Sequence, residues 1–401
     1  MKKAYLVILN IVSISIIIPS TRDGSQVYGK QKNNIEIIQR ANRVEISLIK
    51  TIGGQEEQNE KYILNLSRDV SVDLNKNLYI VDNGDFAIKK YNNKFEYVST
   101  IGRRGQGPGE FNYRPWYINI DNKGYMYVFL LQSSSYYFIL KLESDGREVQ
   151  RNRMAVFNPG VNKPRILNNN DKIIMPIHRF TEEMVKEAKE KGLDIEKEYP
   201  LLGIGIYDIP KISDSINPIT PLKYIYIKGK NSDDPITVGI NDTHFTIDKD
   251  DNIYVAFRYQ NRIEKYSNEG SFQSTFKLNK KYEETNKAKT VDIIENGVKT
   301  GVRIIMNNFS KCIDVDNKGR IWILTENQPE EEKDYKDMSK LDEIRRKREE
   351  IIVLDRDGTE LSVIPYTSFN SGQYFRIYND KLYIINSTSE RAVYIYQIVE
   401  K

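Results

Sequence analysis

Cysteine and histidine are scarce in this chain of 401 residues, which has one cysteine, Cys312, and two histidines, His178 and His244. A single cysteine excludes an intramolecular disulfide and any metal cluster built from several thiolates. A zinc site with three histidine ligands is excluded as well, and only a site of two histidines with a carboxylate stays open. The fold must therefore be stabilised by packing.

An excess of one charge sign is also missing. The 60 Lys and Arg residues face 56 Asp and Glu, so the net charge is only +4, spread along the whole length. Without a basic face, we expect no nucleic-acid partner. The composition, 39% hydrophobic and 29% charged, is that of a soluble globular protein, and the 27 tyrosines lie largely in short β-branched runs that favour strands.

The chain has one long apolar run, at its start. Met1-Lys-Lys is followed by apolar residues 4–18, then by Pro19 and by a small-residue cleavage site at Val27-Tyr-Gly29. This pattern predicts a signal peptide over 1–29, followed by a lead-in over 30–43. The alternative is an uncleaved N-terminal anchor, the one case in which we expect membrane contact. Either reading places the protein outside the cytoplasm: periplasmic, cell-surface or secreted.

A strand–turn–strand pattern recurs along the rest of the chain. The six copies occupy residues 70–81, 118–128, 165–175, 245–255, 313–323 and 375–385. The first two spacings are close to the period of propeller blades, roughly 40 to 50 residues. Third and often fourth strands follow the copies, as at 86–91 and 97–101. The pattern predicts an all-β fold, a six-bladed β-propeller of four-stranded blades over 44–401.

The last copy has a third strand at 393–398 and no fourth, whereas Val44 to Ile52 reads as a fourth strand with no blade before it. Pairing these two would close the ring and leave few exposed edges. We therefore predict that the N-terminal strand completes the last blade.

Three insertions explain much of the irregular spacing, although the gap of 80 residues from Ile174 to Tyr254 stays long even with its insertion. Residues 180–199 and 329–350 are charged, with apolar side chains at helical spacing, and predict two helical insertions. Residues 285–306 contain Asn296-Gly297 between two apolar runs, which predicts a hairpin.

The segment Gly105-Gln-Gly-Pro-Gly-Glu-Phe111, followed by Pro115, Ile118, Asp121, Gly124, Tyr127 and Val128, resembles an NHL repeat. This repeat is the blade unit of a class of six-bladed propellers common in exported bacterial proteins. The resemblance implies a family that includes protein-binding and carbohydrate-associated modules as well as lyases and lactonases. The matched residues shape turns and packing, so the resemblance supplies no catalytic residue.

Two groups of residues look like ligand loops and have a simpler explanation. The glycines at 102, 105, 107 and 109 precede a strand with Pro115, whereas a nucleotide-binding loop needs a following helix, so we expect a loop between blades. Asp-rich segments at 248–251, 314–319 and 355–358 resemble calcium-loop fragments, but none has the glutamate at the twelfth position. They are typical of hairpin turns.

Residues just before each first strand and just after each second strand lie around the central channel of a propeller. The candidate ligand-binding residues before the first strands are Arg68, Asp69, Arg114, Trp116, Arg165, His244, Asn308, Tyr374 and Arg376. Those after the second strands are Asp82, Arg179, Arg258 and Tyr259. Arginines with aromatic rings bind carboxylates, sugars or peptides through forked hydrogen bonds and stacking.

These features favour an exported binding or interaction module, a monomer, with a protein, peptide or carbohydrate ligand at the axial face. No nucleophile–base pair stands out, so the catalytic residues are unknown. The alternative is a metal-assisted lyase or lactonase-type hydrolase with an axial carboxylate site. No cofactor is predicted, although a calcium ion on the axis stays open. A third hypothesis is a scaffold that uses the helix at 329–350 to bind a partner.

Overall fold

The computed structural model describes most of the chain from residue 43 onwards. The described ranges are 8–10, 35–37, 43–133, 136–155, 163–167, 172–176, 202–208, 222–227, 242–285, 289–295, 298–336 and 340–401, with the single residues Lys186 and Glu190. The predicted leader lies outside these ranges except for β1 (Ile8–Asn10), which pairs with β2 (Ile35–Ile37). None of the helices in these ranges combines the length and apolar character that crossing a bilayer requires.

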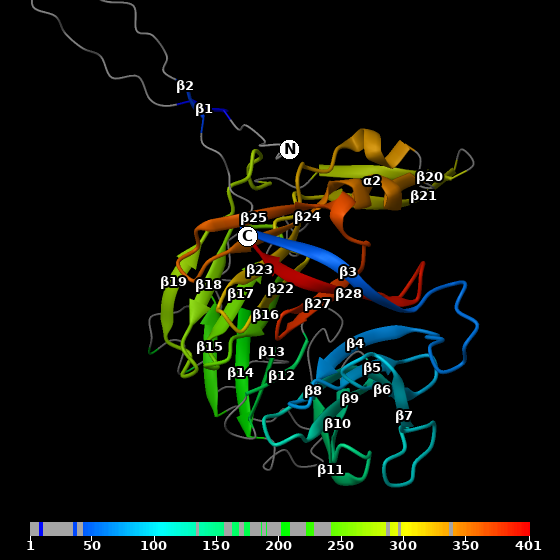
Figure 1. Ribbon diagram of the computed structural model, residues 1–401. Helices are drawn as coiled ribbons and strands as arrows, with labels where there is room; N and C mark the ends of the chain where they lie inside the picture. The colour runs from blue at the N-terminus through cyan, green and yellow to red at the C-terminus, as the bar shows by residue number, and fades with distance from the viewer. Residues whose placement is uncertain are drawn as a thin grey trace, which may run out of the picture.

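Six four-stranded antiparallel sheets form a ring of blades (Figure 1). The first three blades are β4 (Ser67–Val72), β5 (Leu78–Asp82), β6 (Ala87–Tyr91) and β7 (Tyr97–Ile101); β8 (Arg114–Ile120), β9 (Met126–Ser133), β10 (Tyr136–Leu142) and β11 (Glu148–Ala155); and β12 (Arg165–Ile166), β13 (Lys172–Pro176), β14 (Leu202–Asp208) and β15 (Lys223–Ile227). The fourth and fifth are β16 (Thr243–Ile247), β17 (Ile253–Phe257), β18 (Ile263–Tyr266) and β19 (Phe272–Phe276); and β22 (Cys312–Val315), β23 (Ile321–Glu326), β24 (Glu349–Leu354) and β25 (Glu360–Pro365). The predicted six-bladed propeller is confirmed.

The sixth blade contains both ends of the ring. Its strands are β26 (Tyr374–Tyr378), β27 (Lys381–Asn386), β28 (Ala392–Glu400) and β3 (Val44–Gly53), and β3 runs antiparallel to β28. Val44 is buried in the core that the fifth and sixth blades share, so β3 contributes packing as well as backbone hydrogen bonds. The predicted closure of the ring by the N-terminal strand is confirmed.

Burial decreases from the second strand of a blade to the fourth. Every residue of β5, β17 and β23 is buried, because neighbouring blades pack on both faces of these strands. The outer strands β7 and β19 each bury only their last residue. The apolar runs that the sequence repeats are therefore the strands that form the cores between blades.

An aspartate in the turn between the first two strands explains why the repeat looks alike in four blades. Its Oδ1 accepts the backbone N–H four residues later, and its Oδ2 accepts a hydrogen bond from the aromatic side chain six residues later. The pairs are Asp73 with Tyr79, Asp121 with Tyr127, Asp248 with Tyr254 and Asp316 with Trp322. Turn chemistry, predicted for the segments 248–251, 314–319 and 355–358, is found at Asp248, Asp316 and Asp355 but not at Asp314, which binds Arg165.

The glycine-rich segment joins the first two blades, between β7 and β8, as predicted. Gly102 has φ +78°, and its open side is filled by the ring of Phe111, which is fully buried. Glu110 accepts a hydrogen bond from the backbone N–H of Gly107 at 2.9 Å and pairs with Arg103. These contacts leave the segment packed against its own side chains, as expected for a loop between blades.

Two of the three predicted insertions fall largely within the described residues. The hairpin at 285–306 is β20 (Lys289–Glu295) and β21 (Val298–Ile305). The insertion at 329–350 is less helical than predicted: it contains a 3-10 turn, η3 (Glu332–Lys336), and the short helix α2 (Leu341–Arg348), and β24 already begins at Glu349. Another 3-10 turn, η5 (Tyr366–Ser368), follows β25. The third, at 180–199, lies outside the described residues apart from Lys186 and Glu190.

The hairpin and the helix form one unit beside the ring (Figure 1). Ile305 of β21, Tyr335 of η3 and Leu341 of α2 are buried together in a small separate core. This unit brings α2 to one end of the central channel, where the candidate site lies.

Candidate functional site

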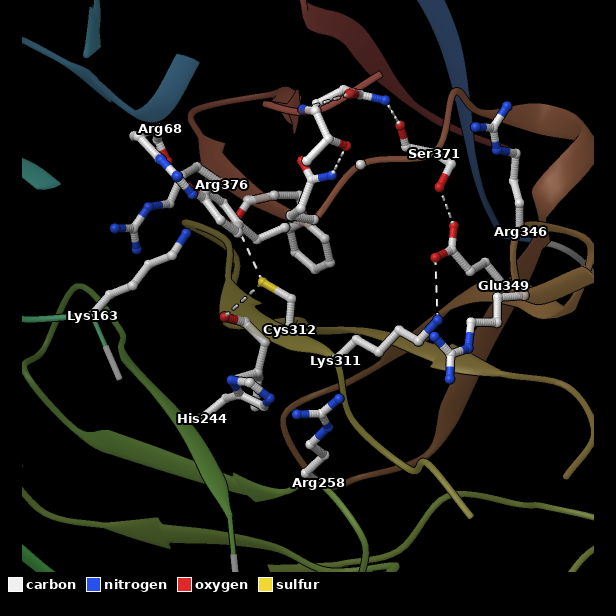
Figure 2. Close-up of a pocket in the computed structure, with 18 of the residues that line it drawn as sticks. Arg68, Lys163, His244, Arg258, Lys311, Cys312, Arg346, Glu349, Ser371 and Arg376 are labelled. Atoms are coloured by element: carbon white, nitrogen blue, oxygen red, sulfur yellow. Dashed lines mark hydrogen bonds and ion pairs between the residues drawn. The ribbon is translucent and has the colours of Figure 1, made fainter. Parts of the chain in front are cut away.

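A cavity of about 630 Å³ opens where the innermost strands end around the axis (Figure 2). It is lined by β4, β12, β16, β22 and β26 and by the α2 insertion. Its lining residues are Arg68, Lys163, Arg165, His244, Phe245, Arg258, Lys311, Cys312, Ile313, Asp342, Arg345, Arg346, Glu349, Ser371, Gly372, Gln373, Tyr374, Phe375, Arg376, Asn386, Thr388 and Ser389. A cavity of this size lies within the range of small-molecule sites, roughly 300 to 1,000 Å³.

The lining is strongly cationic. Eight of the lining residues are Lys or Arg, whereas only Asp342 and Glu349 are acidic. The chain as a whole carries a net charge of only +4, so this concentration of positive charge is a local feature. What the site can bind depends on how many of these cations already have carboxylate partners.

Arg376 of β26 is fully neutralised. Its Nε and one terminal nitrogen donate hydrogen bonds of 2.9 Å each to the two oxygens of Asp69 on β4, and both side chains are buried. The backbone N–H of Ile118 donates to the same carboxylate at 3.2 Å. The forked geometry fixes Arg376 at the floor of the cavity and joins the first and last blades.

Arg165 of β12 has a similar partner. It donates to Asp314 of β22 at 3.2 Å and to the hydroxyl of Thr246 at 3.0 Å. The second oxygen of Asp314 accepts the backbone N–H of Ile377 at 2.9 Å. Burial raises the pKa of Asp314 to about 7, although hydrogen bonds to its carboxylate from the hydroxyl of Thr246 and the backbone N–H of Ile377 oppose the rise.

Lys311 lies between two glutamates. Its Nζ is 2.8 Å from Glu326 and 3.2 Å from Glu349, and Glu349 also accepts a hydrogen bond from the hydroxyl of Ser371 at 2.7 Å. Burial lowers the pKa of Lys311, but the two carboxylates outweigh burial and the net direction is upward. Lys311 is therefore charged and already paired.

Two cations on one side of the cavity are less completely paired. The guanidinium of Arg68 stacks on Trp116 with 4.5 Å to the ring centroid, and within the described ranges no carboxylate lies at ion-pair distance from it. The Nζ of Lys163 lies over the ring of Tyr374, makes no hydrogen bond among the described residues, and is 3.8 Å from Asp69, which already holds Arg376. Burial, and then the charge of Arg376, lowers the pKa of Lys163 to about 7.

Two further cations, at separate places around the cavity, have no carboxylate partner in the described ranges. Arg258, just after β17, donates through Nε to the neutral amide oxygen of Asn308 at 3.2 Å. Arg346 of α2 is exposed at the rim. Neither side chain has a carboxylate at ion-pair distance in the part of the chain that the structure describes. In Figure 2, Arg68 and Lys163 lie on the left of the cavity, Arg258 lies at the bottom and Arg346 at the upper right.

The helix α2 is fixed in place by its own ion pairs. Arg348 donates to both oxygens of Asp334 at 2.6 and 2.8 Å, and Arg345 donates to Glu330 at 2.9 Å. Arg348 and Asp334 are buried, so the pair holds the helix against the segment before it. Arg346 is left pointing to the cavity rim.

The structure brings six of the predicted ligand-binding residues to this cavity: Arg68, Arg165, His244, Arg258, Tyr374 and Arg376. Asp69 lies behind Arg376, and Trp116 supports Arg68. Arg114 turns away to bond the side chain and the backbone oxygen of Asn83.

Asn308 lines a smaller adjoining cavity of about 190 Å³, which shares Arg258, Lys311 and Arg345 with the first and also contains Tyr259. Asp82 accepts the backbone N–H groups of residues 65 and 66 and does not line either cavity. His178 and Arg179 lie outside the described residues.

The sequence reasoning missed Lys163, Lys311, Arg345 and Arg346. Lys163 and Lys311 stand immediately before the first strands of their blades, so the positional rule that selected Arg68 could have found them. Arg345 and Arg346 are on an insertion, and no repeat pattern indicates which end of the ring an insertion covers.

The carboxylates nearest the axis do not form a metal site. Asp69 and Asp314 are bound to arginines, and the described ranges contain no group of three or more His, Cys, Asp or Glu placed to hold a metal ion. Cys312 is buried, its thiol faces the backbone oxygen of Phe375 at 3.6 Å, and burial raises its pKa to about 11. At neutral pH this cysteine is therefore a neutral thiol rather than a reactive thiolate.

The fold is shared with solved structures of low sequence identity. A member of the duf4221 family from Bacteroides vulgatus ATCC 8482 has a TM-score of 0.52 and 12% identity, covering 90% of this chain and 99% of that chain. A protein from Bacteroides fragilis NCTC 9343, whose assignment as exported is itself a prediction, has a TM-score of 0.50 and 11% identity, covering 90% and 97%.

No protein-family model matches the chain, and no curated protein matches its sequence. At such low identities the structural likeness shows the fold alone. The chain is a six-bladed β-propeller similar to these bacterial proteins, and its closer resemblance to the NHL repeat stays a prediction.

Proposed function

We propose that this chain is an extracytoplasmic binding protein whose axial cavity takes an anionic ligand of small-molecule size. The observation that carries the proposal is the set of three arginines at the cavity, Arg68, Arg258 and Arg346, with no carboxylate at ion-pair distance in the described ranges. Lys163 lies beside them and shares Asp69, at 3.8 Å, with Arg376. Holding unpaired positive charge beside a partly enclosed cavity costs free energy, and a bound anion would offset that cost.

Arginine suits this role, because its planar guanidinium binds carboxylate or phosphate oxygens through two parallel hydrogen bonds. Arg68 is oriented for it by stacking on Trp116, which leaves the edge of the guanidinium for a ligand. The site therefore favours a carboxylate- or phosphate-bearing ligand over a neutral sugar.

The metal-assisted lyase or lactonase requires carboxylates that converge on the axis. The described axial carboxylates, Asp69 and Asp314, are instead bound to Arg376 and Arg165. This arrangement supports the binding proposal over the hydrolase.

Binding can be measured by isothermal titration calorimetry with matched pairs of probes, galacturonate against galactose and glucose 6-phosphate against glucose. The anionic member of at least one pair should bind and the neutral member should not. Arg68→Gln should weaken that binding at least tenfold, since a hydrogen bond to a charged group contributes about 1.5 to 3 kcal/mol. Arg147→Gln, on an exposed turn, is the matched control and should bind like the wild type.

Failure of every anionic probe to bind, or equal binding by wild type and Arg68→Gln, would refute the proposal. Export is tested separately by fractionating cells that express the full chain and determining the N-terminus of the mature protein by mass spectrometry. Recovery in the cytoplasm with Met1 intact would contradict an extracytoplasmic protein.

A further inference from the structure

We propose that Lys163 forms a reversible imine with the carbonyl group of an oxo acid whose carboxylate is held by Arg68. This inference rests on the proposed anion-binding function, and it adds the class of ligand and a covalent bond. The amine of Lys163 has no hydrogen-bond partner in the described ranges. It lines the cavity on the same side as Arg68 (Figure 2).

Tyr374 of β26 contacts both Lys163 and Arg68. The Nζ of Lys163 is 3.0 Å from the centroid of the Tyr374 ring, and the hydroxyl of Tyr374 donates a hydrogen bond to the backbone oxygen of Arg68. Lys163 stands just before β12 and Arg68 is on β4, so three different blades supply these side chains. Because both residues contact one ring and line one cavity, a single small ligand can reach the amine and the guanidinium together.

The amine of Lys163 is placed where its protonated form is disfavoured. The side chain is 14% exposed, and Nζ is 3.8 Å from Asp69, whose two oxygens already accept hydrogen bonds of 2.9 Å from Arg376. Burial and then the charge of Arg376 lower the pKa of Lys163 to about 7, although Asp69, Cys312 and Asp314 oppose the shift. About half of the amine is therefore neutral at pH 7.

A neutral amine attacks a carbonyl carbon, and desolvation or a neighbouring cation activates a lysine for this reaction. Lys163 has both. The lone pair of Nζ forms a C–N bond to the carbonyl carbon, and the carbonyl oxygen gains the proton that Nζ loses. The resulting hydroxyl group then leaves with the second Nζ proton as one molecule of water, and a C=N bond remains. The step therefore needs no oxidant or reductant.

Arg68 supplies the second half of the recognition. Its guanidinium stacks on Trp116 at 4.5 Å, and its Nε has no hydrogen-bond partner among the described residues. A carboxylate bound there through forked hydrogen bonds would hold the rest of the ligand beside Lys163 and raise the effective concentration of its carbonyl group. An oxo acid should therefore react faster than a simple ketone.

Reductive trapping tests the covalent bond. The full chain is incubated at neutral pH with cyanoborohydride, which reduces an imine to a stable secondary amine, and with pyruvate or levulinate, in which the ketone and the carboxylate are differently spaced. Peptide mass spectrometry should find Lys163 labelled about tenfold or more faster than the exposed Lys94 by at least one of the two. Acetone, which lacks the carboxylate, should label Lys163 about tenfold more slowly.

Two variants separate the amine from the anion site. Arg68→Gln should slow the labelling of Lys163 by the oxo acid about tenfold and leave its labelling by acetone unchanged, whereas Arg147→Gln should behave like the wild type. In calorimetry without reductant, the wild type should bind the oxo acid about tenfold more tightly than its counterpart without a ketone, lactate for pyruvate or pentanoate for levulinate. Lys163→Met should bind both members of the pair equally.

Labelling of Lys163 no faster than Lys94 by both oxo acids would overturn the inference. The proposed anion binding would stay in place if lactate, pentanoate, galacturonate or glucose 6-phosphate still binds and Arg68→Gln weakens that binding. Equal labelling of Lys163 by the oxo acid and by acetone would also overturn it, because it shows a reactive amine without recognition of the carboxylate. Absence of binding by all anions, without labelling of Lys163, overturns both proposals.

Discussion

Lys163 is expected to destabilise the folded protein while serving the ligand. Its side chain is 14% exposed, its Nζ has no hydrogen-bond partner among the described residues, and its pKa is lowered from 10.5 to about 7 by burial and then by Arg376. Each pKa unit corresponds to about 1.4 kcal/mol, so the cost of the protonated form in the folded state is at most roughly 5 kcal/mol. Lys163→Met removes this cost and keeps an apolar side chain of similar length.

The sign of the pH dependence follows from the two pKa values. Between about pH 7 and 10.5 the unfolded chain holds a proton on Lys163 and the folded chain does not. The wild type therefore gains about 1.4 kcal/mol of unfolding free energy per pH unit in this window, and Lys163→Met lacks that gain. Below pH 7 both states are protonated and the full cost is present.

Urea denaturation at pH 7.5, 8.5 and 9.5 measures the difference between the variant and the wild type. Asp314, whose pKa is about 7, titrates mainly below this window. Lys163→Met should be more stable by a few kcal/mol at pH 7.5, and the advantage should shrink by about 1.4 kcal/mol per pH unit. An advantage that does not change with pH, or a loss of stability at pH 7.5, would refute the reasoning. The exposed Lys94→Met is the control.

Three further changes test the fold. Asp69→Asn should cost about 3 to 5 kcal/mol of unfolding free energy in urea, because it leaves the buried charge of Arg376 unpaired, and adding Arg376→Met should recover much of the loss; additive losses would contradict this. Gly102→Ala should lower the free energy of unfolding by about 2 kcal/mol or more, because residue 102 has a positive φ and a Cβ there would lie 2.4 Å from the Phe111 ring. An unchanged midpoint of urea denaturation would show that the loop can shift to accept the Cβ. Tyr79→Phe removes the hydrogen bond to the aspartate of its own hairpin turn and should lower the free energy of unfolding by about 1 kcal/mol. An unchanged thermal denaturation midpoint would show that this hydrogen bond does not stabilise the hairpin.

The repeated strands, the turns and the closure of the ring could be predicted from the sequence because each depends on local chemistry. The aspartate of each turn and the aromatic residue six positions later can both be recognised within one sequence repeat, as at Asp316 and Trp322. The predicted fourth strand at Val44 had no blade of its own, and only the last blade had a third strand without a fourth, so the pairing of the two could be inferred.

The weaker parts of the prediction are those that depend on distant residues. The first strand of the third blade, β12, has only two residues, so its hydrophobic pattern is too short to place the strands that follow. The insertion at 329–350 has apolar residues at helical spacing, yet part of it outside α2 is held by ion pairs to the helix, as where Asp334 pairs with Arg348, and these pairs require no α-helix at residue 334.

The composition of the site was the hardest to foresee. Arg376 and Asp69 are separated by 307 residues and meet only because the ring closes. Arg376 and Arg68 occupy similar positions in the sequence repeat, so the sequence does not show which of them has a carboxylate partner. That depends on contacts between distant residues. The sequence therefore predicts that the ligand-binding site lies at the axial face. It does not show that the cations there outnumber their carboxylate partners.

The pairing of β3 with β28 also sets the order in which this molecule can become native. Residues 44–53 leave the ribosome early, whereas their partner strand at 392–400 is made some 340 residues later. Until then β3 and β27 each present an unpaired edge to other chains, which is a hazard for aggregation. The hydrogen bonds to Asp69 from Arg376 also wait for the sixth blade, because Arg376 lies on β26, so the cation pattern of the cavity arises late in synthesis. A chain interrupted before residue 374 should therefore lack the complete binding site even where its first five blades have formed.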